Sequence, residues 1–279
     1  MRSAHARKRR RGPAFLYSVP IGVLGGLIGL GGAEFRLPVL AGPLGYPPRQ
    51  AIPLNLAVSL VTLVVSLAIR INALSASPLA PLFYGIAAMI SGAVVAAFFG
   101  PALAGRLSDE KLERVILILL VAIGVLLIVE GVLPKQLPAL LPDSRACHLV
   151  AGTLFGLLIG LVSSLLGVAG GELIIPTLVF AFGADIKTAG TASLIVSLPT
   201  VIVGVARYAT RGAFDSREDL TETLMPMGFG SVIGALIGGL LVGILPASVL
   251  KVVLGVILNV SAWRIFRGHS TGDSAKVPT

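Results

Sequence analysis

Charged residues are scarce in this chain of 279 residues, where they make up 13%. A soluble domain carries about 25%, so the composition excludes an ordinary soluble fold. The single cysteine, Cys147, excludes an intrachain disulfide and a cysteine-based metal cluster. The three histidines, at positions 5, 148 and 269, fall outside the long apolar segments. An enzyme embedded in the membrane needs a nucleophile–base pair or metal ligands inside those segments, so we expect neither an enzyme nor a cofactor.

Long apolar runs take the place of the missing charge. The chain is 55% hydrophobic with a mean hydropathy of +0.95, and most of its apolar blocks approach or exceed the ~18–20 residues that cross a bilayer as a helix. Blocks of this length without strict alternation predict helices. We expect an all-α polytopic membrane protein with about eight spans, at 15–30, 51–71, 79–103, 115–129, 149–166, 189–205, 224–245 and 249–265.

The net charge of +9 lies mostly in tails and loops. Basic flanks of membrane spans are retained on the cytoplasmic side, so we interpret the run RKRRR (7–11) as a cytoplasmic N-terminal tail and expect no nucleic acid partner. The same run is also typical of the start of a signal peptide. No small-residue cleavage site follows cleanly, so we expect an uncleaved first span with the N-terminus inside.

The sequence contains itself twice. Shifted by 138 positions, GLGGAEFRLPVL (29–40) aligns with GVAGGELIIPTL (167–178). The alignment continues without a gap and gives 14 identities in 40 positions, among them glycine, glutamate and proline. Prolines 134, 138 and 142 forbid a continuous helix between the two copies. The predicted organisation is a basic tail (1–12), a first half (13–131), a connecting loop (132–147), a second half (148–267) and a polar tail (268–279).

Duplicated membrane halves are the architecture of secondary transporters, with the site marked by Gly/Pro-interrupted segments at matching places. The apolar run between Gly32 and Gly45 is too short to cross, so it and its equivalent are expected to be half-helices or re-entrant segments. Free N–H groups at the start of each piece make an anion site. The glycines that open the two segments, and are expected near the substrate, are Gly29, Gly31, Gly32, Gly167, Gly170 and Gly171.

Glu34 and Glu172 occupy equivalent positions in these segments. An acid inside the membrane is by default a functional hypothesis, and three interpretations stay open: a helix cap, a carrier of the coupling proton, or a pair of cation ligands. Arg36 has no basic equivalent in the second half, where Ile174 stands. It is interpreted as structural, neutralising Glu34, or else as contacting an anion or snorkelling to the interface.

Small polar residues follow in the next helix of each half. Asn55, Ser59, Thr191, Ser193 and Ser197 share one face at i, i+4 spacing, and are expected either to contact the substrate or to pack helices together. The small-residue run GSVIGALIGG (230–239) predicts close helix packing.

The doubled motif, followed by AGTASLIVSLPTVIVGVARY (189–208), resembles the sulfite exporter (TauE/SafE) family. The resemblance covers roughly 15–266, with Ala33 and Arg36 as departures in the first half. It implies a multi-pass permease of the bacterial inner membrane for small sulfur-containing or organic anions such as sulfite or sulfonates. We expect an anion transporter with proton coupling through Glu34 or Glu172, and a homo-oligomer as one possibility. The alternatives are a cation exchanger built on the two acids and a scaffold or enzyme.

The orientation of the halves stays open at this point. If the short segments re-enter, each half has four crossings and the halves are parallel. If they cross, each half has five and the halves are inverted. The distribution of Lys and Arg does not separate the two topologies.

Overall fold

A computed structural model describes residues 10–28, 31–73, 77–132, 139–241 and, further on, 248, 252, 255, 256 and 258–260. The regular structure of these residues is helical. In chain order the elements are α2 (Arg11–Ile28), α3 (Ala33–Ala41), α4 (Pro48–Ala73), η1 (Ser77–Leu82), α5 (Phe83–Arg106), α6 (Asp109–Val132), α7 (Arg145–Leu166), α8 (Gly171–Pro176), η2 (Thr177–Ala181), α9 (Ile186–Ala209), α10 (Arg217–Asp219), η3 (Leu220–Leu224) and α11 (Met225–Leu240).

Six long apolar helices confirm six of the expected spans: Pro48–Ala68, Leu79–Arg106, Asp109–Val129, Arg145–Leu166, Thr188–Ala209 and Arg217–Leu240. The expected span at 15–30 corresponds to α2, which is not among these six. The expected span at 249–265 lies mostly outside the described residues, as do most of the two tails.

The expected half-helices are α3, with nine residues, and α8, which continues into the π-helical turn η2. Each begins after a left-handed glycine, Gly32 with φ 68° and Gly170 with φ 79°. A Cβ at Gly32 would lie 2.7 Å from the backbone oxygen of Ile21, and one at Gly170 would lie 2.9 Å from the Ile159 side chain. Only glycine tolerates both the backbone angle and the close approach, so these residues let each chain segment turn back against the preceding helix.

The second short segment returns along the full length of α7. Gly170 lies beside Ile159, and the N–H groups of Leu140 and Leu141, just before α7, donate to the carbonyls of Phe180 and Ala181. Helix α9 then runs in the same direction as α7, because the Tyr208 hydroxyl near its end donates to the Ser164 carbonyl near the end of α7. The segment 167–185 therefore crosses from one end of the helices to the other.

The two halves run in opposite directions. Gly204, near the end of α9, faces Leu56, near the beginning of α4, so these two central helices are antiparallel. Where the halves meet, a Cβ at Gly31 would lie 3.7 Å from the Cβ of Ala169, and these two residues are equivalent in the repeat. A pair of equivalent residues in contact marks a pseudo-two-fold axis between antiparallel halves, which is the inverted arrangement.

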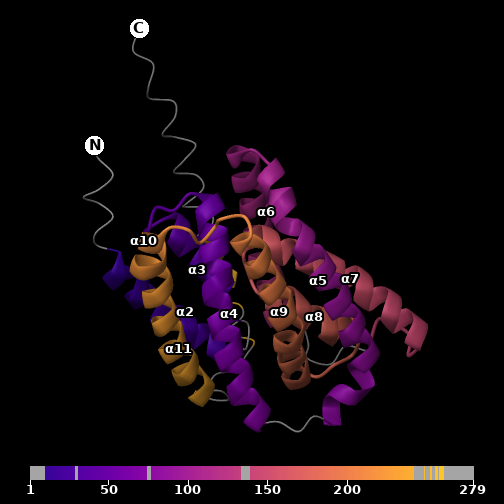
Figure 1. Ribbon diagram of the computed structural model, residues 1–279. Helices are drawn as coiled ribbons and strands as arrows, with labels where there is room; N and C mark the ends of the chain where they lie inside the picture. The colour runs from indigo at the N-terminus through magenta and orange to yellow at the C-terminus, as the bar shows by residue number, and fades with distance from the viewer. Residues whose placement is uncertain are drawn as a thin grey trace, which may run out of the picture.

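Two helix pairs flank this centre, and each pair has one helix from the first half and one from the second. Helix α11 of the second half lies against α2 of the first, and α5 of the first lies against α7 of the second (Figure 1). The partners touch backbone to backbone, since a Cβ at Gly156 would lie 2.2 Å from the Met89 oxygen, and one at Gly234 would lie 2.2 Å from the Val19 oxygen. The prediction of close packing by the run 230–239 is thus confirmed.

Replacing Gly234 with alanine is expected to lower the stability of the protein by about 1–3 kcal/mol, because the added methyl group collides with the backbone of α2. The matched control is Gly228→Ala in the same helix, where nothing lies within 4 Å of the added Cβ. That control is expected to be neutral or to gain up to about 1 kcal/mol from helix propensity. The thermal midpoint of the purified protein in detergent measures both, and equal midpoints would contradict the packing of α11 on α2.

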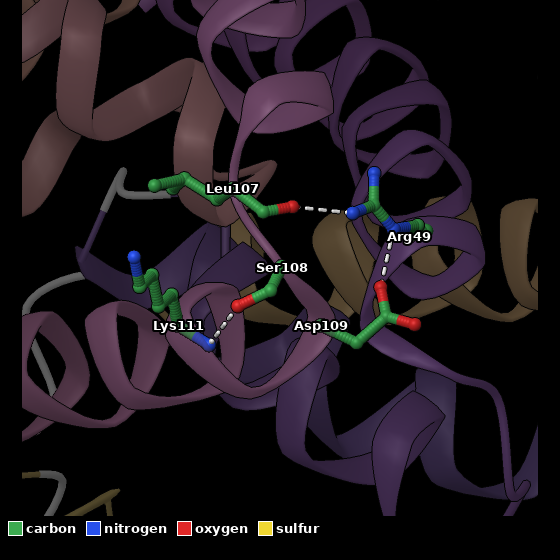
Figure 2. A network of polar contacts seen from close by, with 5 residues as sticks. All are labelled: Arg49, Leu107, Ser108, Asp109 and Lys111. Carbon is green, nitrogen blue, oxygen red and sulfur yellow. Dashed lines mark hydrogen bonds and ion pairs between the residues drawn. The ribbon is translucent and has the colours of Figure 1, made fainter.

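Charged contacts fasten the helix ends. The Arg49 guanidinium at the beginning of α4 donates to the Asp109 carboxylate and to the Leu107 carbonyl, and Ser108 accepts from the backbone N–H of Lys111 (Figure 2). These contacts hold the beginning of α4 against the turn between α5 and α6.

A second set of polar contacts joins the two halves at the same end of the helices. Arg11 pairs with Glu222 at 2.6 Å, and the Tyr46 hydroxyl donates to Asp219 at 2.9 Å. Burial raises the pKa of Tyr46, so its hydroxyl stays protonated and continues to donate to Asp219. The loop before α4 is therefore tied to the segment before α11.

Candidate functional site

The two acidic residues of the repeat meet between the halves. Glu34 is in the first turn of α3 and Glu172 in the first turn of α8, and their side chains are 0% and 1% exposed. The two carboxyl groups interact directly with each other. None of their four oxygens has a hydrogen-bond partner of normal geometry among the described residues. Each acid lies in the first turn of its short helix and close to the other acid, and the helix-cap interpretation stays a prediction beside those of proton carrier and cation ligand.

Arg36 lies two residues further along α3 and is completely buried. Snorkelling to the interface, one of the alternatives for this residue, is therefore wrong. Its guanidinium is attracted to Glu34 and donates to five acceptors over 3.1–3.4 Å. These are Asn55 Oδ1, Ser59 Oγ, the Gly31 carbonyl, Thr62 Oγ1 and Ser231 Oγ. Most of these contacts are longer than the usual 2.7–3.2 Å of an N–H···O bond, and Nε has no partner.

The acceptors come from both halves of the protein. Asn55, Ser59 and Thr62 lie on successive turns of α4, and the Asn55 amide also donates to the Ala33 carbonyl at 2.8 Å, which holds the start of α3 against α4. Ser231 belongs to α11 and accepts or donates at 2.6 Å with Ser18 of α2. The guanidinium thus bridges the first half to a helix of the second.

Five of the candidate residues are brought together in this region by direct contacts: Gly31, Glu34, Asn55, Ser59 and Glu172. Gly32, Gly167, Gly170 and Gly171 form the backbone that places the two acids. Gly29 lies outside the described residues.

The polar residues of α9 are buried but make different contacts. Ser193 donates to the Gly190 carbonyl of its own helix at 2.9 Å. Ser197, the equivalent of Ser59, is 1% exposed and its hydroxyl has no partner. Thr191 is 7% exposed. Neither Ser193 nor Ser197 is joined by a hydrogen bond to the acids or to Arg36.

Two contributors to the site were missed by reasoning from the sequence. Thr62 repeats as Thr200 in the aligned halves, and this match was a usable signal. Ser231 was hidden in a run predicted to serve packing alone, and only the contact between α2 and α11 brings it to Arg36.

Comparison with protein families decides the identity. The model described as "Sulfite exporter TauE/SafE" matches residues 1–127 and 152–278. The chain belongs to the sulfite exporter TauE/SafE family. No curated protein and no solved structure matches it.

Membership confirms the resemblance drawn from the doubled motif. The two matched segments agree with the internal repeat, and the protein is a multi-pass membrane transporter of anions and not an enzyme. The buried acids and Arg36 of this TauE/SafE transporter are accordingly considered as parts of a transport site.

Proposed function

We propose that the transporter carries small sulfur-containing or organic anions, such as sulfite or sulfonates, across the bacterial inner membrane with proton coupling. The substrate would bind between the starts of α3 and α8, where two inverted half-helices direct their positive ends toward the middle of the protein. The observation that carries this proposal is Arg36, a guanidinium with 0% exposure next to the two carboxyl groups. A buried charge without a functional role is rarely retained in a membrane interior.

The proposed substrate-contacting set is the one predicted from the repeat, with Arg36 added. Backbone N–H groups at the glycines would receive anion oxygens, and the hydroxyls and amide of α4 and α9 would complete the shell. Beside Arg36, the set comprises Gly29, Gly31, Gly32, Glu34, Asn55, Ser59, Gly167, Gly170, Gly171, Glu172, Thr191, Ser193 and Ser197.

A cation exchanger built on Glu34 and Glu172 is the competing function. The carboxyl pair favours it, but a cation between these acids would also face the Arg36 guanidinium in an interior where charges are weakly screened. Among the described residues, no group of three or more His, Cys, Asp or Glu side chains could hold a metal ion. The charge distribution therefore supports the anion over the cation.

The proposal predicts that sulfite or a sulfonate raises the thermal midpoint of the purified protein, and that divalent cations do not. A ligand that binds only the folded state stabilises it by about 2.7 kcal/mol at one hundred times its dissociation constant. Sodium chloride at matched ionic strength is the control for salt effects. Stabilisation by a divalent cation without stabilisation by any sulfur oxyanion would favour the cation exchanger instead.

The membrane orientation is proposed from the sequence. The basic run before α2 would lie in the cytoplasm under the positive-inside rule. With five crossings in each half, one of the two counts left open by the sequence, the end of the second half would return to the same side.

A further inference from the structure

The described interior of this transporter holds three charged side chains: Glu34, Arg36 and Glu172. Their formal charges add to −1 when both carboxyl groups are ionised, to zero when the pair carries one proton, and to +1 when it carries two. Net charge is costly in a membrane interior, so the protonation of this cluster and the charge of a bound substrate must compensate each other.

Comparison of the two halves shows that the first half alone has a basic residue at the position of Arg36. Arg36 corresponds to Ile174, and two of its partners change with it, since Asn55 corresponds to Ser193 and Ser231 to Ala93. The hydroxyls of Ser59 and Thr62 persist as Ser197 and Thr200. In the second half, α8 and α9 form with Ile174 buried at 0% exposure. The fold therefore does not require a guanidinium at this position.

The geometry also leaves Arg36 able to change partners. It makes no short hydrogen bond, its Nε is free of partners, and three of its five acceptors are hydroxyl groups that can rotate. Oxyanion oxygens can replace such acceptors on a guanidinium, which binds them through parallel N–H donors.

No other titratable group faces this cluster from the described parts of the neighbouring helices. The side chains that contact Arg36 or its partners from these helices are Ser18 of α2, Asn55, Ser59 and Thr62 of α4, and Ser231 of α11. The Tyr208 hydroxyl of α9 is bonded to the Ser164 carbonyl at the end of α7. Among the side chains of α6 that the structure describes, the charged ones belong to residues 109–114, at the beginning of the helix, and α6 contacts α8.

We propose that Arg36 makes the site selective for singly charged anions and sets the coupling at one proton for each anion. This proposal rests on the function proposed above. In the empty site the carboxyl pair carries one proton, so the net charge of the three side chains is zero. When a monoanion binds, one proton from water adds to a carboxylate oxygen of Glu34 or Glu172, and the loaded site is again neutral. A dianion such as sulfate leaves the site at −1, because the pair has no oxygen left to protonate. The site therefore favours sulfonates and hydrogen sulfite over sulfate.

The test is binding of methanesulfonate and of sulfate to the purified protein by calorimetry in two buffers with different ionisation enthalpies, which reports proton uptake. Wild-type protein is expected to take up about one proton per bound methanesulfonate, as the charge balance requires, and to bind sulfate at least about 30-fold more weakly, the cost of an uncompensated buried charge. Equal binding of the two anions, or methanesulfonate binding without proton uptake, would overturn the proposal.

Variants separate the charge of Arg36 from its structural contacts. Arg36→Met is expected to weaken methanesulfonate binding about 30-fold or more, whereas Arg36→Lys retains proton uptake on binding. The variant Arg36→Ile/Asn55→Ser/Ser231→Ala installs the residues of the second half, guards against misfolding, and is expected to lose binding as Arg36→Met does. Ser91→Ala, at an exposed position on α5 away from Arg36, is the control and is expected to bind as wild type does.

The outcomes distinguish this inference from the proposed function. Wild-type protein that binds no sulfur oxyanion contradicts the proposed function itself. Wild-type protein that binds methanesulfonate, together with a folded triple variant that binds it equally well, contradicts only the role of Arg36.

Discussion

Replacing both Glu34 and Glu172 with glutamine is expected to abolish proton-driven accumulation of the anion while sparing anion exchange. Glutamine keeps the shape of the side chain and cannot take up the coupling proton. Arg36 remains, so the loaded site is neutral and exchange of one anion for another continues. The empty site keeps the uncompensated charge of Arg36, which is costly in the membrane interior and hinders the return step that net transport needs.

Proteoliposomes with an imposed pH gradient measure the proton-driven accumulation of the anion. Exchange of labelled for unlabelled anion at equal pH on both sides measures anion exchange. The double variant is expected to lose accumulation by about 100-fold or more, the scale of losing an essential proton-transfer group. Each single variant keeps one carboxyl group beside Arg36 and is expected to retain coupling. Glu110→Gln, at an exposed position on α6, is the control. Accumulation by the double variant at the wild-type level would exclude these acids as proton carriers.

Replacing Gly167 with alanine is expected to destabilise the protein by about 2–4 kcal/mol and to eliminate transport. Gly167 ends α7 with φ 66°, a left-handed angle that a Cβ disfavours, and the added Cβ would lie 2.2 Å from the Ile52 carbonyl oxygen of α4. The backbone must shift to relieve this contact. Because the shift lies five residues before Glu172, it displaces the carboxyl group from its partner as well.

Gly31→Ala separates the two causes. Its φ is 86°, but an added Cβ meets only ordinary contacts at 3.7 Å, so this variant has the strained angle without the collision and is expected to cost about 1–2 kcal/mol. Thermal midpoints and transport rates of the two variants provide the comparison. Equal effects at both positions would show that the backbone angle alone matters and that the contact with Ile52 does not.

Much of the fold could be predicted because it depends on local patterns in the sequence. Long apolar blocks predicted six spans that the helices confirm, and the register of the repeat predicted short helices opened by glycine at α3 and α8. The opposed direction of the halves could not be predicted, since Lys and Arg are distributed almost equally under either topology. It follows from contacts between distant residues, such as Leu56 with Gly204, which no local pattern encodes.

The candidate site, too, could be predicted from the sequence only in part. Equivalence in the repeat singled out Glu34 and Glu172 before any contact between them was known. Arg36 was underestimated because it has no equivalent in the second half, and symmetry was the main signal available. Its side-chain acceptors lie on α4 and α11, up to 195 positions away, so its burial and its role depend on packing between the halves.

The glycine-lined pairing of α2 with α11 and of α5 with α7 has a mechanical consequence. Each pair is made from both copies of the ancestral unit, so the duplicated sequences are not the bodies that can move as rigid units. A cycle of alternating access would instead move the pair α2–α11 and the pair α5–α7 against α4 and α9. Each of these moving pairs contains one helix from the first half and one from the second. Cutting the chain between its copies would therefore divide each rigid body in two.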